Sequence, residues 1–132
     1  GLTNLVTEPH FAERARQPRL TSFMASSLYN YGVQWQAMRG VAADERTAVA
    51  IDANGIGSVF GSGNAHFVMA TGAPETLTQS TALTWFVGSQ ALKVFQVPAT
   101  TTGANSFNLS TWSGTTGSTS YWHISNGVLT IK

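Results

Sequence analysis

Hydrophobic and polar positions in the first part of the chain predict a strand followed by a helix. Residues 2–7 mix β-branched and apolar side chains, which is typical of a short strand. Pro18 suits the first turn of a helix because its missing N–H removes no internal hydrogen bond. Side chains at helical spacing follow it, at Leu20, Phe23, Met24, Ser27 and Leu28. We therefore expect a helix over residues 18–29, ended by Gly32.

A hairpin and a buried strand are expected next. Residues 47–51 and 57–60 are two strand-like segments separated by Ala53-Asn54-Gly55, which is a strong hairpin signal. Residues 66–71 form a further apolar run. We expect the α/β part of the chain, residues 1–74, to end near Pro74.

The remainder of the chain predicts antiparallel β-structure. From Thr76 onward the sequence has no acidic residue, and its only lysines or arginines are Lys93 and Lys132. Strand-like segments separated by Gly, Pro, Asn and Ser lie at residues 83–87, 91–97, 107–112, 120–125 and 128–131. Asn126-Gly127 marks a tight terminal hairpin. We expect residues 75–132 to form a small antiparallel β region.

Composition and charge narrow the class of protein. A chain of 132 residues with 42% hydrophobic residues can bury a core of its own. A formal net charge of +1 gives no basic footprint for nucleic acid or a membrane surface, and no apolar run of about eighteen residues could span a bilayer. Without cysteine there are no disulfides. The charge-poor second half, rich in Thr, Ser, Gly and Asn, favours a secreted or periplasmic bacterial protein.

The charge that the chain does have is concentrated in residues 8–19. This segment holds one of three histidines, two of six acidic residues and three of seven cations. His10 would lie at the carboxyl end of a strand, where α/β sheets bind ligands, and an imidazole beside a carboxylate is the usual general base for a hydroxyl nucleophile. The alternative is a histidine with a structural hydrogen bond.

Three arginines lie within a span of six residues after this histidine, at Arg14, Arg16 and Arg19. Guanidinium groups bind carboxylates through paired hydrogen bonds, so these residues predict a pocket for an acidic substrate. The alternative is a solvated helix start in which the arginines pair with Glu8 and Glu13.

Other polar residues give weaker signals. Asp44 and Glu45 could hold one of the arginines or the backbone of a turn. The Gly-Ser-Gly-Asn loop at residues 61–64 lacks the lysine of a phosphate loop and the Gly-x-Ser-x-Gly order of a serine hydrolase, so we expect a turn. His66 and His123 have no metal-ligand spacing with His10, so no metal or cofactor is predicted.

The segment around His10 resembles the cyanophycinase-like serine peptidases. That family carries Asp-Gln-His-Phe-x-x-Arg-x-Arg-x-x-Arg-Leu, and residues 8–20 keep the His, the Phe, the three Arg and the Leu at the same spacing. A Gly-Ile-Gly-Ile-Asp-Glu-x-Thr-Ala stretch in the family is similar to residues 40–48, and a hairpin ending near Gly-Ser-Gly is similar to residues 61–63. The match covers roughly residues 1–70, and the tail is similar to the β-rich extension of exported members.

This resemblance implies the C-terminal half of a class I glutamine amidotransferase-like α/β sandwich, followed by the small antiparallel region. It implies that His10 is the base of a Ser-His dyad or triad. The residues implied to line the substrate pocket are Glu8, Arg14, Arg16 and Arg19, with Asp44 and Glu45 supporting them. In the family the nucleophilic Ser and the acidic triad member precede the His motif.

We therefore expect this chain to be the C-terminal product of a precursor cleaved before Gly1. It would act on acidic peptide substrates while bound to the N-terminal chain of the same precursor, and a higher homo-oligomer of that unit is allowed. Glu8 and Pro9 depart from the family's Asp and Gln, which leaves open a catalytically silent assembly or binding subunit. A third hypothesis is carbohydrate binding by an exposed platform of Trp85, Trp112, Tyr121 and Trp122.

Overall fold

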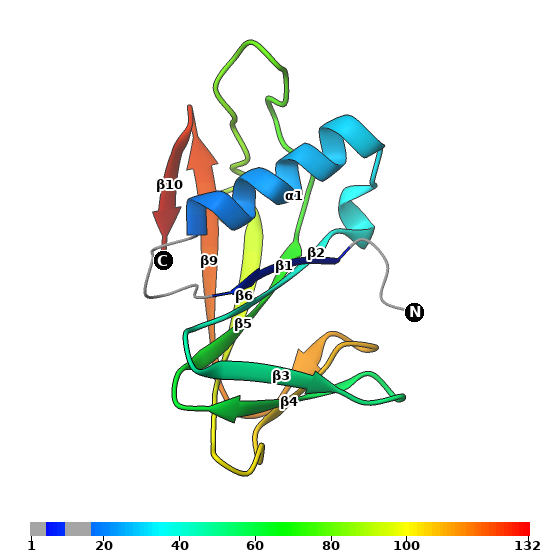
Figure 1. Ribbon diagram of the computed structural model, residues 1–132. Helices are drawn as coiled ribbons and strands as arrows, with labels where there is room; N and C mark the ends of the chain where they lie inside the picture. Colours follow the sequence, from blue (N-terminus) through cyan, green and yellow to red (C-terminus); the bar gives the residue numbers. More distant parts are fainter. Residues whose placement is uncertain (1–4, 10–16) are drawn as a thin grey trace.

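The computed structural model describes the backbone of residues 5–9 and the whole of residues 17–132, and these form three layers (Figure 1). A six-stranded sheet is the middle layer, with the order β1 (Leu5–Pro9), β2 (Arg39–Ala43), β5 (Asn64–Ala70), β6 (Leu92–Pro98), β9 (Ser118–Ser125) and β10 (Val128–Ile131). Helix α1 (Gln17–Tyr31) covers one face. The other face packs on a four-stranded sheet with the order β3 (Thr47–Ile51), β4 (Ile56–Gly61), β7 (Ser106–Asn108) and β8 (Ser113–Gly114).

Parallel pairing joins β1 and β2, which are connected through α1 and a short 3-10 helix (Trp35–Ala37). Every other strand pair described in the two sheets is antiparallel. The prediction of an α/β sandwich is therefore wrong, since the described chain is mostly antiparallel β-structure with one α-helix, α1. Parallel strands need a crossover of a dozen or more residues, and after β2 the chain reverses mainly through turns.

Local signals located several elements correctly. The helix predicted over residues 18–29 is α1, and the predicted hairpin is formed by β3 and β4. β9 and β10 form the terminal hairpin, in which Asn126 and Gly127 have φ of 49° and 83°, as a type I′ turn requires. The boundary expected near Pro74 lies between β5 and β6, which pair along their whole length in one sheet.

Two predicted strands differ in the structure. Within residues 83–87 there are single bridges, from Thr84 to Thr76 and from Trp85 to Ile124, and no continuous strand. Within residues 107–112 the strand stops at Asn108. The Asn108 side chain accepts the backbone N–H of the second and third residues that follow it, so it starts a turn where the pattern predicted a continuing strand.

The connection from β5 to β6 is long, but its base is held firmly. Trp85 is fully buried in the core beneath α1, and its indole N–H donates to the carbonyl oxygen of Gly72 at 2.8 Å. The carboxylate of Glu75 accepts the backbone N–H groups of Phe86 and Val87, and these bonds lower the pKa of Glu75. Residues 78–82 at its tip are exposed.

Two cores hold the layers together. Leu20 and Met24 of α1 are fully buried against the six-stranded sheet, and each contributes on the order of 2 kcal/mol by burial. Phe67 of β5 and Phe107 of β7 lie in the second core, between the sheets. In the part of the chain described by the structure, no helix has the length and apolar character needed to cross a membrane.

Gly61, at the end of β4, has φ of +123°, and a Cβ there would collide with the carbonyl oxygen of Arg46. We expect Gly61→Ala to lower the free energy of unfolding by more than about 3 kcal/mol, because both the backbone angle and the contact must change. Gly88 is a matched control: its φ is +63° with nothing within 4 Å of such a Cβ. Gly88→Ala should cost about 1–2 kcal/mol. Equal losses in urea denaturation would contradict the steric argument.

Candidate functional site

The parallel strands β1 and β2 end level with each other. Pro9, the last residue of β1, is opposite Ala43, the last residue of β2, and Glu8 is opposite Ala42. Asp44 and Glu45 follow β2 directly. We call this end of the parallel pair, with Asp44 and Glu45, the β1–β2 rim. Loops that leave the carboxyl ends of parallel strands are where such units bind ligands.

The predicted catalytic segment is only partly covered by the structure. His10, Arg14 and Arg16 lie outside the described residues. Arg19 is the third residue of α1, is exposed, and stacks its guanidinium over the ring of Phe23 at 5.3 Å from the ring centre. This cation–π contact stabilises the Arg19 guanidinium over the Phe23 ring.

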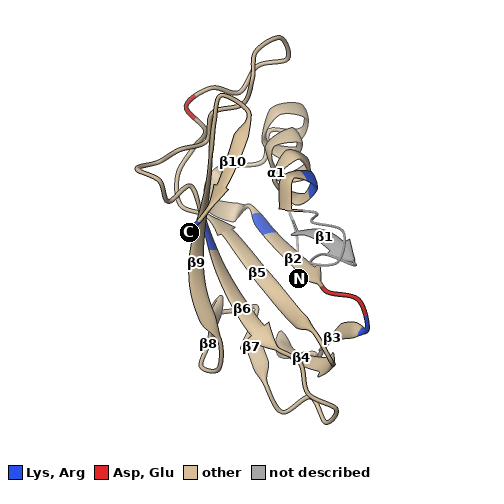
Figure 2. Ribbon diagram, turned by 90° about the vertical axis from the view of Figure 1, so that its left-hand side faces the viewer, with Lys and Arg blue, Asp and Glu red and all other residues tan. Residues whose placement is uncertain are grey.

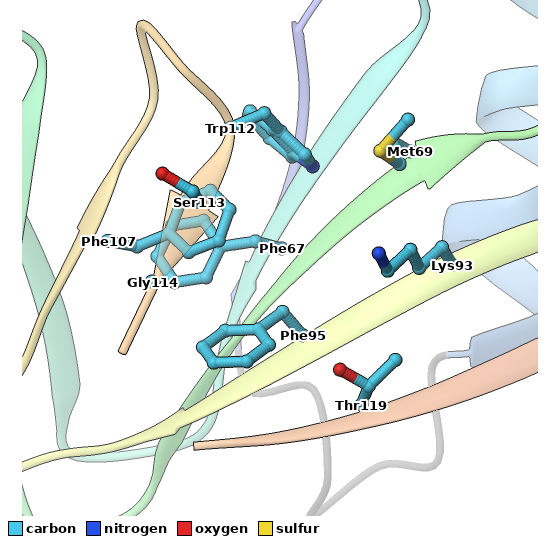
Figure 3. Close-up of a pocket in the computed structure, with 9 residues that line it drawn as sticks. All are labelled: Phe67, Met69, Lys93, Phe95, Phe107, Trp112, Ser113, Gly114 and Thr119. Atoms are coloured by element: carbon cyan, nitrogen blue, oxygen red, sulfur yellow. The ribbon is translucent and has the colours of Figure 1, made fainter. Parts of the chain in front are cut away.

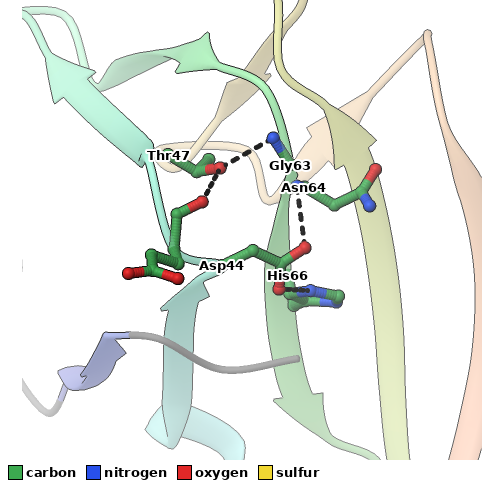
Figure 4. Close-up of polar contacts among 6 residues, drawn as sticks. Asp44, Thr47, Gly63, Asn64 and His66 are labelled. Atoms are coloured by element: carbon green, nitrogen blue, oxygen red, sulfur yellow. Dashed lines mark hydrogen bonds and ion pairs between the residues drawn. The ribbon is translucent and has the colours of Figure 1, made fainter. Parts of the chain in front are cut away.

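Asp44 is a buried carboxylate with partners on β5 (Figure 4). Its Oδ1 lies 3.0 Å from Nε2 of His66, and its Oδ2 accepts the backbone N–H of Asn64 at 2.8 Å. The backbone N–H of Asp44 donates to the carbonyl oxygen of Asn64 at 3.0 Å. The sequence predicts that Asp44 binds either an arginine or the backbone of a turn, and the contact with the N–H of Asn64 is of the second kind. The pairing with His66 is not predicted by the sequence.

The Gly-Ser-Gly loop brings its backbone close to this carboxylate. A Cβ on Gly63 would lie 2.7 Å from both Cβ of Asp44 and Oγ1 of Thr47, so only glycine fits without displacement. The Thr47 hydroxyl accepts the N–H of Gly63 at 3.0 Å and donates to the carbonyl oxygen of Glu45 at 3.3 Å (Figure 4). Residues 61–63 therefore act as a turn that closes over Asp44, and the side chain of Glu45 is left exposed.

Burial favours the neutral form of the His66 ring. Burial lowers its pKa below the ordinary 6.5, and the hydrogen bond and the charge of Asp44 oppose this shift only in part. Since a carboxylate only accepts, Nε2 of the neutral ring carries the proton that is shared with Asp44. The pair has the chemistry of a histidine oriented by a carboxylate. The predicted hairpin of β3 and β4 indicates this contact, because it returns the chain so that β5, which carries His66, pairs with β2.

A concave site of about 280 Å³ lies on the opposite face of the six-stranded sheet (Figure 3). Aromatic side chains of β5, β6 and β7 and of the segment before β8 form its walls. Its lining residues are Phe67, Met69, Lys93, Phe95, Phe107, Trp112, Ser113, Gly114 and Thr119. We call it the aromatic pocket.

The structure does not support the predicted carbohydrate platform. Trp85 is fully buried and Trp122 is 3% exposed, both in the core beneath α1. Trp112 lies instead on the other side of the sheet, in the wall of the aromatic pocket. The tryptophans therefore do not share one exposed face. In the described ranges, no group of three or more His, Cys, Asp or Glu side chains could hold a metal ion.

No protein-family profile, no curated protein and no solved structure matches the chain. The resemblance to cyanophycinase-like peptidases thus depends on the sequence motifs at residues 8–20, 40–48 and 61–63. Arguments about the site depend on the geometry of the β1–β2 rim and of the aromatic pocket.

We expect Asp44→Ala to lower the free energy of unfolding by about 2–4 kcal/mol, because it leaves the N–H of Asn64 and the ring of His66 without their carboxylate partner. Glu45→Ala is the matched control. The Glu45 side chain is exposed, so its removal should change stability by less than about 0.5 kcal/mol. Urea denaturation of both variants checks this, and similar values would show that the buried contacts of Asp44 contribute little.

The lowered pKa of His66 predicts a loss of stability in acid. In the unfolded chain His66 binds a proton at a higher pH than in the folded chain, so its contribution is fully present above about pH 6.5 and decreases as the pH falls below that value. We expect His66→Gln to lose less unfolding free energy than the unmodified chain between about pH 7 and pH 5. Parallel pH dependence in the two proteins would contradict a lowered pKa.

Proposed function

We propose that this chain supplies the general base and the carboxylate-binding arginines of a two-part serine hydrolase that acts on acidic peptides. The nucleophilic serine would lie on the N-terminal chain of the same precursor. The observation that carries the proposal is the level ending of β1 and β2. His10 is the next residue after Pro9, and Asp44 is the next after Ala43.

The spacing of parallel strands supports this assignment. Neighbouring strands lie about 4.8 Å apart, so the segments leaving Pro9 and Ala43 start from adjacent points. Asp44 and Glu45 give this rim two carboxyl groups, of which Asp44 is fixed by the start of β5. An imidazole needs a neighbouring acceptor to fix its tautomer when it acts as a base. A carboxylate-rich rim would provide that acceptor.

The proposed reaction moves one proton through His10. Its imidazole takes the proton of the serine hydroxyl as the oxygen attacks the substrate carbonyl, and then returns it to the leaving amine. Water regenerates the serine in the reverse sequence. Arg14, Arg16 and Arg19 would orient the carboxylates of the substrate by paired hydrogen bonds. The motif of residues 8–20 supports these roles.

The position of β1 at the edge of the sheet supports the proposed pairing with a partner chain. β1 is the end strand of the described order, and an end strand can accept a further strand through main-chain hydrogen bonds. A strand of the N-terminal chain that pairs there would bring its own loops to the same rim. The partner's serine would then approach from a neighbouring strand end.

We expect His10→Ala in the native assembled protein to slow labelling by a fluorophosphonate probe by at least about 100-fold, since it removes the general base. Lys132→Ala, which changes an exposed residue near the end of the chain, should leave labelling unchanged. Mass spectrometry of the labelled material should place the probe on a second polypeptide present in equal amount.

Unchanged labelling of His10→Ala would contradict the assignment of the base. Absence of labelling from the unmodified protein, in a complex that still contains both polypeptides, would favour the catalytically silent assembly subunit. A folded, unpartnered chain in native material would refute the two-chain arrangement.

A further inference from the structure

The aromatic pocket is separated from the β1–β2 rim by the six-stranded sheet. Alternate residues of β5 point to opposite faces, so Phe67 and Met69 reach the pocket while Val68 packs beneath α1. Its volume of about 280 Å³ is just below the range that is usual for small-molecule sites. A ligand with a single ring is therefore the appropriate size, and its binding does not depend on the proposed hydrolase activity.

The walls of the pocket present aromatic faces and edges. The rings of Phe67 and Phe107 stack with centroids 4.1 Å apart, and the Trp112 ring meets Phe107 edge-on at 5.0 Å. Phe67 and Phe107 are almost fully buried, so they pack behind the site and fix its shape, whereas Phe95 and Trp112 are partly exposed and offer the ring surface that a ligand can contact. Partly exposed aromatic rings of this kind can stack with, or meet edge-on, the ring of a ligand.

Positive charge lies along one side of this aromatic site. Arg39, Met69 and Lys93 are cross-strand neighbours on β2, β5 and β6, so the two cations lie on the same face of the sheet. Figure 3 shows the Lys93 amine extending from β6 toward the space between Trp112 and Phe95. In Figure 2 the charged positions of β2 and β6 are blue, the colour of Lys and Arg.

Arg39 is fixed beside the pocket. Its guanidinium lies 5.3 Å from the ring centre of Trp112, and its Nη1 donates to the carbonyl oxygens of Gln36 and Met38 at 3.0 and 2.9 Å. The nine described residues that line the pocket include no Asp or Glu. A pocket with aromatic walls, a lysine amine and no acidic lining residue is complementary to an anion attached to a ring.

We propose that the aromatic pocket binds a small aromatic carboxylate. The ring of the ligand inserts between Trp112 and Phe95, and its carboxylate accepts hydrogen bonds from the amine of Lys93. The hydroxyl of Thr119, which lines the same side of the pocket, is a second donor. Arg39, whose guanidinium lies 5.3 Å from the ring centre of Trp112, adds positive potential beside the pocket.

Titration of the full chain with phenylacetate, followed by ¹H–¹⁵N NMR, tests this proposal. We expect a saturable shift of the indole N–H of Trp112 and little change at Trp85, whose indole is bonded to Gly72 in the other core. Phenylacetamide, which has the same shape without the charge, should bind about tenfold more weakly, because a hydrogen bond to a charged group contributes more than a neutral one. Acetate should not compete.

Two variants locate the carboxylate. Lys93→Met keeps most of the side-chain stem and should weaken phenylacetate binding about tenfold. Arg46→Met removes one positive charge from the exposed turn between β2 and β3 and should leave binding unchanged. The proposal is overturned if phenylacetate gives no saturable shift at millimolar concentration, if phenylacetamide binds equally well, or if the two variants lose affinity equally.

Discussion

The burial of β5 on both faces is the constraint on which the rest of the structure depends. This strand pairs with β2 on one side and β6 on the other, and four consecutive residues from Ala65 to Val68 are buried. Because side chains alternate along a strand, β5 contributes to the core beneath α1 and to the core between the sheets. Strands covered on both faces are characteristically near-continuous apolar runs. β5 therefore joins the three layers, because its side chains pack in both cores.

The same alternation links the two candidate sites. His66 and the backbone of Asn64 hold the carboxylate of Asp44, whereas Phe67 and Met69 line the aromatic pocket on the other face. A shift of β5 by one residue relative to β2 would exchange these faces and dismantle both sites at once. The glycine turn before β5 opposes such a shift, because its close contact with Asp44 fixes where the strand begins.

Elements defined by local chemistry could be predicted from the sequence, and long-range pairing could not. The Asn126-Gly127 turn and the helical spacing after Pro18 gave correct positions because their determinants lie within a few residues. The resemblance implied the wrong fold, since β1 and β2 are the one parallel pair among the strands of the described chain. Asp44 was singled out as a polar residue after a strand. The contact of His66 with Asp44 could not be predicted, because the two residues are 22 positions apart in the sequence and only the pairing of β2 with β5 brings them together.

The long connection between β5 and β6 divides into an anchored base and an exposed end. Trp85 and the carboxylate of Glu75 tie the base to the body of the protein, while residues 78–82 extend away from the layers as the uppermost loop of Figure 1. Exposed loop ends of this kind tolerate inserted sequence, since no buried hydrogen bond or core side chain is lost. This end of the molecule can therefore accept an affinity tag or a fluorophore, or diverge in length during evolution, without a change in either core.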